Sequence, residues 1–157
     1  MKILLLAIGK TDSKALDELI QTYAKRIPHY LPYEMKVLPD VRRSGKTSHD
    51  EQRTAEGRAI LAELQTGDRL ILLDERGKAY TSVEFAQHLE RRMLASDKRL
   101  VFVIGGPYGF APEVYARADE QLTLSRMTFS HQMVRLFITE QIYRAMTILR
   151  GEPYHHE

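Results

Sequence analysis

Short apolar runs alternate with amphipathic segments along the whole chain. Most of the runs are continuous, which is typical of strands covered on both faces. They predict strands at residues 2–8, 33–38, 69–73, 99–104 and 121–124. Between them, apolar residues recur at helical spacing, with proline or glycine near the ends of the segments. This spacing predicts helices at residues 13–26, 50–65, 81–95, 112–118 and 131–150.

The alternation of strands and helices predicts an α/β fold, with a mostly parallel sheet and helices on both faces. No internal repeat, low-complexity tract or linker interrupts the pattern, and 157 residues is the length of one domain. Residues 1–157 are therefore expected to form a single domain.

The last predicted helix is apolar around nearly its whole circumference. Its polar positions form a narrow set that includes Arg135, Glu140, Arg144 and Thr147. A helix that is apolar on most sides is buried on most sides. Such a helix can be central to the core of its own domain, or a second subunit can cover it. Because the helices of a small domain normally lie at its surface, the pattern favours an oligomer interface.

The chain carries 23 basic and 21 acidic side chains, a formal net charge of +2. Proteins that bind nucleic acids non-specifically usually have a larger basic excess, because phosphate neutralisation supplies most of their affinity. The charge therefore neither requires nor excludes a nucleic acid, and an RNA substrate would be recognised as part of a larger shaped object. The best candidates for RNA contacts are Arg42, Arg43 and Lys46, in a loop predicted at residues 40–50, with a merely solvated loop as an equal alternative.

Several classes of function are excluded by residues that the sequence lacks. The chain has no cysteine, which excludes disulfides, thiolate zinc sites, iron–sulfur clusters and a cysteine nucleophile. Its histidines lack the spacing of a metal site, so no metal is expected. Gly45 and Lys46 end like a phosphate loop, but the first glycine that such a loop needs would fall on Asp40. The apolar run at residues 2–8 is too short to span a bilayer and no cleavage site follows it, which predicts a cytoplasmic protein without a membrane partner.

Ligands of open α/β sheets bind beyond the carboxyl ends of the strands. Three predicted loops fall there, at residues 74–78, 105–109 and 125–129. The second is rich in glycine, which allows a ligand to approach the backbone closely. Taken alone, this glycine cluster is more typical of a tight turn than of a ligand site, and it lacks the spacing of the dinucleotide fingerprint.

Three segments in a fixed order resemble one known family. They are FVIGGPYG at residues 102–109, LSRMTFSHQMVR at residues 124–135, and EQIYRA at residues 140–145 continuing to GEPYH at residues 151–155. No single segment is specific, but the ordered set is, and the similarity covers essentially the whole chain. On these residues the sequence resembles the ribosomal RNA large subunit methyltransferase H family, which belongs to the SPOUT class of methyltransferases.

The resemblance implies a SPOUT-type α/β domain whose carboxyl-terminal part forms a trefoil knot, an exception to the rule against threaded chains. It also implies a homodimer that uses S-adenosylmethionine as its cofactor. The implied reaction is methylation at N3 of pseudouridine 1915, in helix 69 of the large-subunit rRNA of the assembled bacterial ribosome. Two other interpretations stay open at this point: a non-enzymatic α/β module that binds a metabolite or the ribosome, and a SPOUT methyltransferase that acts on tRNA.

Carried over by position, the resemblance implies a cofactor site made by three loops, with backbone groups that hold the cofactor and apolar walls. The cofactor-binding residues are Leu73, Gly105, Leu124, Ser125, Arg126, Met127, Thr128 and Phe129. Methyl transfer needs an aligned nucleophile, and N3 of the pseudouridine must lose its proton. The catalytic candidates are Arg135 for charge stabilisation or substrate anchoring, and His131, Tyr154 and His155 for positioning or proton handling.

The end of the chain departs from the family pattern. Family tails carry arginine or lysine after Tyr-His, whereas His156 holds that place here. At neutral pH a histidine attracts phosphate less than an arginine does. Ribosome binding by this chain is therefore expected to depend less on salt than binding by a tail that ends in arginine.

Overall fold

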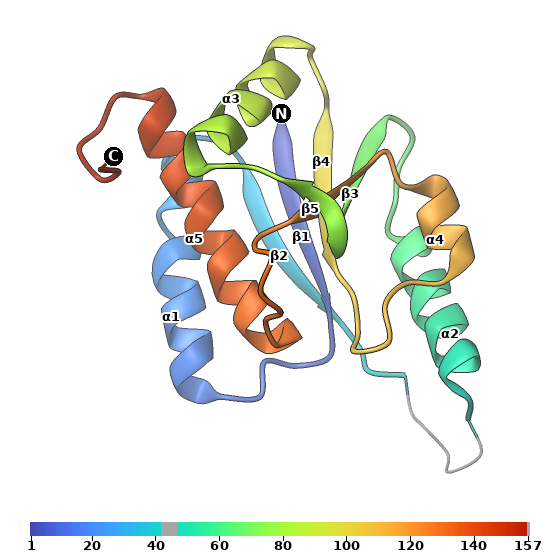
Figure 1. The fold of residues 1–157 in the computed structure, drawn as a ribbon. Coiled ribbons are helices and arrows are strands. Elements are labelled where there is room, and N and C mark those ends of the chain that lie inside the picture. The colour runs from blue at the N-terminus through green and yellow to red at the C-terminus, as the bar shows by residue number, and fades with distance from the viewer. Residues whose placement is uncertain (42–46, 157) are drawn as a thin grey trace.

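In the described part of the chain, five parallel strands form one sheet in the spatial order β2-β1-β4-β3-β5 (Figure 1). Their bounds are β1 (Lys2–Ile8), β2 (Tyr33–Leu38), β3 (Asp68–Ala79), β4 (Arg99–Ile104) and β5 (Glu120–Thr123). The prediction of a mostly parallel sheet is confirmed, whereas the trefoil knot stays a prediction. The computed structural model describes residues 1–41 and 47–156, so the RNA-contact candidates Arg42, Arg43 and Lys46 lie outside the described residues.

Helices cover both faces of the sheet, as predicted (Figure 1). Their bounds are α1 (Lys14–Ala24), α2 (His49–Ala62), α3 (Ser82–Leu94), α4 (Pro112–Arg117) and α5 (His131–Leu149), with a short 3-10 helix at Ile27–His29. The helices α1 and α3 pack against α5 on one face, and α2 packs with α4 on the other. Four helices begin at a hydroxyl side chain that accepts a hydrogen bond from the first turn, which explains where they start. These capping residues are Ser13, Ser48, Thr81 and Ser130.

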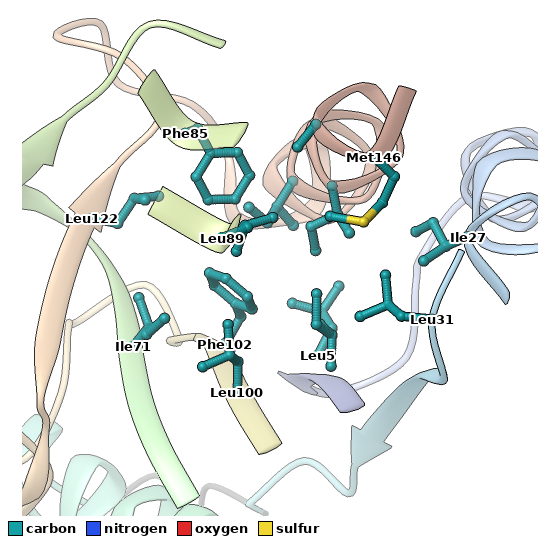
Figure 2. Close-up of a cluster of buried hydrophobic side chains, with 14 of the residues drawn as sticks. Leu5, Ile27, Leu31, Ile71, Phe85, Leu89, Leu100, Phe102, Leu122 and Met146 are labelled. Atoms are coloured by element: carbon teal, nitrogen blue, oxygen red, sulfur yellow. The ribbon is translucent and has the colours of Figure 1, made fainter. Parts of the chain in front are cut away.

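The core consists of two apolar layers, because successive side chains of a strand point to opposite faces of the sheet. Figure 2 shows one layer, a cluster to which the sheet contributes Ile71 and Phe102, α3 contributes Phe85 and α5 contributes Met146. The layer on the opposite face joins strand residues to α2 and α4, and it includes Leu4, Leu6, Leu70, Val101, Ile60 and Val114. The two layers hold the sheet rigidly, so that the carboxyl ends of its strands form a fixed platform.

The last helix, α5, lies between α1 and α3 on one face of the sheet. Its buried apolar residues include Ile138, Ile142 and Ala145, so one side of the helix is central to the core of its own chain. Other apolar side chains are not fully covered, and Met133 is 38% exposed. The inner side of α5 is therefore apolar because it is buried in the core of its own chain. That the outer side of α5 is an oligomer interface stays a prediction.

The predicted end of the third strand is wrong. The strand β3 does not stop at Leu73 but continues to Ala79, through the charged segment that predicts a loop. Its pairing with β5 shifts register between Leu73 and Lys78, so Leu122 of β5 faces both of these residues. A Cβ atom at Gly77 would lie 2.4 Å from the backbone nitrogen of Leu122, which only glycine avoids. The bulge and this close approach let a polar, glycine-containing segment remain in the sheet.

A partly buried ionic cluster connects the edge strand β5 to its neighbours. Glu120 accepts hydrogen bonds from Arg69 of β3 at 2.8 Å and lies 2.8 Å from Nε2 of His88 on α3. Burial raises the pKa of Glu120, but the interactions with His88 and Arg69 outweigh burial and lower this pKa from its usual 4.5 to about 2. The ionised carboxylate therefore stabilises the folded state.

Glu120→Gln is expected to lower the free energy of unfolding at pH 7 by roughly 1–3 kcal/mol, because the donors Arg69 and His88 lose a charged acceptor. Folding lowers the pKa of Glu120, so its ionised carboxylate contributes fully to the free energy of unfolding above pH 4.5. This contribution is lost as the pH falls towards about 2. Urea unfolding of both proteins at several pH values measures the difference. A difference that stays constant or grows below pH 4.5 would contradict this role.

Two further observations concern residues 1–41 and 47–156. None of the helices in these ranges has the length and apolarity needed to cross a bilayer. The same residues contain no group of three or more histidine, cysteine, aspartate or glutamate side chains placed to hold a metal ion.

Candidate functional site

A cavity of about 370 Å³ opens at the carboxyl ends of β4 and β5, beside residues 73–75 within β3. Its walls come from three segments that are far apart in the sequence, namely residues 73–75, 104–110 and 122–134. At this edge β4 ends at Ile104, which lies beside Leu73, the last residue of β3 before the bulge. The cavity thus occupies the place where parallel α/β sheets bind their ligands.

The structure brings together nearly all of the predicted cofactor-binding residues around this cavity. The residues that line it are Leu73, Gly105, Leu124, Ser125, Met127, Thr128 and Phe129. Arg126 is the exception, since it is exposed and does not line the cavity. The loop after β5 is shaped by its own hydroxyls: Thr123 donates to the carbonyl of Ser125 at 2.8 Å, and the Ser125 hydroxyl accepts from the amide of Met127 at 2.9 Å. These local bonds hold the loop open as a wall rather than filling the cavity.

The glycine turn after β4 forms the floor of the cavity and is packed against α2. A Cβ atom at Gly106 would lie 2.9 Å from Oε2 of Glu56, a buried carboxylate that accepts a hydrogen bond from Gln52 at 3.0 Å. Only a residue without a side chain can therefore lie this close to Glu56 without displacing it. The helix α2 consequently supports the turn from behind, and the backbone of the turn faces the cavity.

Acidic residues stand on the cavity wall at Asp74 and Glu75, which immediately follow Leu73. The hydroxyl of Tyr115 and the backbone amide of Arg76 both donate to the carboxylate of Asp74. Burial raises the pKa of Asp74, but these hydrogen bonds outweigh burial and hold the pKa below its usual value. Asp74 is therefore a fixed negative charge, and the described residues that line the cavity include no lysine or arginine.

Two candidate catalytic residues lie at the start of α5, and only one of them reaches the cavity. His131 lines the cavity beside Val134. Arg135 does not, because its side chain is fully buried and points towards the end of β1. Its guanidinium donates to the carbonyls of Gly9 at 2.7 Å and Ile8 at 2.8 Å. Arg135 therefore ties α5 to β1, which favours a positioning role over direct contact with a substrate.

The other two candidates lie on the carboxyl-terminal tail, which folds back along α5. The hydroxyl of Tyr154 donates to Oε1 of Glu140 at 2.8 Å, and burial together with this bond raises the pKa of Tyr154 above its usual value. Arg144 bridges the same carboxylate at 2.5 Å and Nδ1 of His155 at 3.1 Å. The tail is thus fastened by a network centred on Glu140, and neither Tyr154 nor His155 lines the cavity.

The comparisons with known proteins decide the family. A family model described as "Predicted SPOUT methyltransferase" matches residues 1–155. Proteins called ribosomal RNA large subunit methyltransferase H are 56% identical in Porphyromonas gingivalis, 55% in Parabacteroides distasonis and 51% in Flavobacterium johnsoniae, over 100% of this chain and of each relative. The chain belongs to the ribosomal RNA large subunit methyltransferase H family, within the SPOUT methyltransferases.

A solved structure supports the fold alone. A probable methylase family protein from Haemophilus influenzae superimposes on this SPOUT methyltransferase with a TM-score of 0.50 and 11% sequence identity. The match covers 99% of this chain and 70% of the other. The similarity of fold extends over nearly the whole chain, although few residues are identical.

Within one chain of this SPOUT methyltransferase, the cavity and the tail lie on different sides of α5. Glu140, which anchors the tail, follows His131 by nine residues, which is about 13 Å along the helix and about half a turn around it. The predicted catalytic set is consequently divided into two groups that a single chain does not bring together.

The sequence pattern places residues 74–78 among the three ligand loops, but it gives Asp74 and Glu75 no individual role and does not point to Glu56. Asp74 and Glu75 fall in a charged stretch that reads as a solvated loop, and only the bulge in β3 turns them to the cavity wall. Glu56 lies on α2, whose contact with the glycine turn is tertiary. The one available signal for Asp74 was its place directly after the apolar run at residues 69–73, because ligands of such sheets bind beyond the predicted strand ends.

Proposed function

We propose that this chain methylates N3 of pseudouridine 1915 in helix 69 of the large-subunit rRNA, within the assembled ribosome, with S-adenosylmethionine as the methyl donor. The observation that carries the proposal is a cavity lined by the three loops to which the family resemblance assigns the cofactor. The chain is also 50% or more identical to the cited relatives over its full length. The reaction places the protein in the cytoplasm, where ribosomes are assembled.

The cavity has properties that suit S-adenosylmethionine. When bound, this molecule supplies an electrophilic methyl group on a sulfonium, so it carries a positive charge at its reactive end. Two acidic residues line the cavity, Glu75 and Asp74, of which Asp74 is paired with Arg76, and no lysine or arginine is among its described lining residues. This lining opposes a phosphate-bearing nucleotide and favours a cationic ligand. Leu73, Leu124 and Phe129 supply apolar surface for the adenine, and the backbone of the glycine turn supplies polar groups.

The tail residues are proposed to act on the pseudouridine. Arginine has no hydrogen-bond acceptor, so Arg144 must donate to Nδ1 of His155, and the proton of a neutral His155 ring then lies on Nε2. His155 is consequently suited to donate a hydrogen bond to a uracil oxygen as N3 loses its proton, rather than to remove that proton through Nδ1. Tyr154 is fixed by Glu140 and would orient the base. His131 remains the candidate for positioning on the cavity side.

A homodimer would join the two halves of the site. One chain holds the cavity on one side of α5 and the tail on the other, so an isologous partner can place its tail over the cavity. The exposed apolar side chains Met127 and Phe129 line the cavity, and Met133 follows in the first turn of α5, with exposures of 76%, 37% and 38%. Such a cluster is typical of a protein–protein contact. Arg135 would then act indirectly, by holding the start of α5 in place.

Incorporation of labelled methyl groups tests the proposed function. The purified protein is incubated with radiolabelled S-adenosylmethionine and, in separate reactions, with unmodified intact ribosomes, free rRNA or tRNA. Label is expected in ribosomes alone. Label in tRNA alone would indicate a different SPOUT activity, and no label in any RNA would indicate a binding module; either result would overturn the proposal.

The exposed His156 gives a prediction about salt. His156→Arg is expected to make ribosome binding more sensitive to salt, with the slope of log K against log salt steeper by up to about 1, because an added phosphate contact releases a counterion. Equilibrium binding at three or more salt concentrations measures the slope. The control is Arg58→Ala, which removes an exposed arginine of α2. An equal or shallower slope for His156→Arg would count against a tail that lies near the RNA backbone.

A further inference from the structure

A second cavity, of about 520 Å³, opens directly beside the cavity proposed to bind S-adenosylmethionine, here called the cofactor cavity. The two share part of their walls at Glu75, Pro107, Gly109 and Phe110. The remaining lining residues of the second cavity, here called the side groove, are Arg53, Arg76, Tyr108 and Tyr115. The side groove thus places two arginines and two tyrosines next to the site of methyl transfer.

Tyr108, which lines the side groove, belongs to a stacked pair of rings. His49, the first residue of α2, stacks on Tyr108 of the glycine turn with 3.7 Å between ring centroids and 18° between planes. Arg53, one helical turn further on, donates to the carbonyl of Tyr108 at 3.1 Å. This bond fixes the position of the Tyr108 backbone, so its ring is presented by a supported turn.

Another part of the wall of the side groove presents a guanidinium. Arg76 lies over the ring of Tyr115 at 5.3 Å from the centroid and donates to the Tyr115 hydroxyl at 2.9 Å. The same hydroxyl donates to Asp74, whose side chain is 7% exposed, whereas that of Arg76 is 75% exposed. The buried carboxylate therefore anchors a planar cation that remains largely open to solvent.

The charges of the side groove argue for stacking rather than for phosphate binding. Arg53 forms an ion pair with Asp50, and Arg76 with Asp74. Glu75 adds another negative charge to the wall. A groove without an excess of positive charge binds a phosphate only weakly, because it offers little electrostatic attraction. Aromatic rings and guanidinium planes instead bind unpaired bases, which have π faces whatever their sequence.

We infer that the side groove holds an unpaired nucleobase of the RNA substrate next to the target nucleotide, stacked between Tyr108 and Arg76. The inference rests on the proposed function, because its occupant belongs to the RNA that is methylated. The shared wall keeps this base adjacent to the target while the target itself enters the cofactor cavity.

Steady-state methylation of ribosomes tests the side groove. Tyr108→Ala is expected to raise the KM for ribosomes about 5- to 100-fold, as the loss of one base stack does. Tyr108→Phe keeps a ring and is expected to remain within about 2-fold of the wild type. Arg76→Ala is expected to raise the KM in the same direction. The control, Arg58→Ala, removes an arginine of α2 that lies outside the side groove and is expected to leave the KM unchanged.

Calorimetric titration with S-adenosylmethionine distinguishes base binding from damage to the glycine turn. The Kd for the cofactor is expected to stay within about 2-fold of the wild type in Tyr108→Ala, because Tyr108 does not line the cofactor cavity. An unchanged KM for ribosomes in Tyr108→Ala, or a loss confined to cofactor affinity, overturns the inference while the proposed function stands. If the wild-type protein methylates no RNA, both the side-groove inference and the proposed function are overturned.

Discussion

Arg135→Ala is expected to lower the free energy of unfolding by about 3–5 kcal/mol. The side chain is fully buried, and its guanidinium donates to the carbonyls of Ile8 and Gly9 and to the hydroxyl of Thr11. Alanine would leave these acceptors without their charged donor and create a cavity between α5 and the end of β1. Urea unfolding at a fixed protein concentration measures the loss.

The control for this prediction is Arg126→Ala. Arg126 is exposed on the neighbouring loop, so its removal is expected to change the free energy of unfolding by less than about 0.5 kcal/mol. If Arg135→Ala instead unfolds like the wild type and loses only methylation, then Arg135 contacts the substrate. In that case the positioning role assigned to it here is wrong.

Two inactive variants are expected to restore activity to one another when they form mixed dimers. Leu124→Arg places a positive charge in the cavity, where it would repel the sulfonium of S-adenosylmethionine. His155→Ala removes a side chain of the tail, which lies on a different side of α5. Each variant alone is expected to lose at least about 100-fold in methylation rate. In a mixed dimer, the intact cavity of one chain meets the intact tail of the other.

Co-refolding of the two variants in equal amounts provides the measurement. Random pairing gives mixed dimers in half of the molecules, each with one intact site of two, so about a quarter of the wild-type activity is expected. Circular dichroism of each variant alone checks that it folds. Activity no greater than the sum of the separate variants would show that cavity and tail do not combine between chains.

The strands and most helices of this protein are predictable from sequence because their signals are local. Continuous apolar runs fall on buried strands, and hydroxyl residues stand directly before the helices that they cap. The end of β3 is not predictable in this way. The segment from Asp74 to Lys78 has the composition of a loop, and only its pairing with Leu122 across a bulge keeps it in the sheet.

The candidate site divides in the same manner. The three cofactor loops follow from the rule that ligands bind beyond strand ends, combined with the family resemblance. The burial of Arg135 cannot be predicted from the sequence. An arginine among the apolar residues of a helix gives no sign that its partners are backbone carbonyls at the end of β1. The side groove is likewise invisible in the sequence, since His49 and Tyr108 meet only after α2 packs behind the glycine turn.

Identification of the methylated nucleoside tests the central claim most directly. Unmodified ribosomes are incubated with the protein and S-adenosylmethionine, the large-subunit rRNA is cut into defined fragments, and its nucleosides are analysed by mass spectrometry. The expected result is a single added methyl group, found as N3-methylpseudouridine in the fragment that contains helix 69. A methyl group on another nucleotide, or unmodified rRNA after prolonged incubation, would contradict the account.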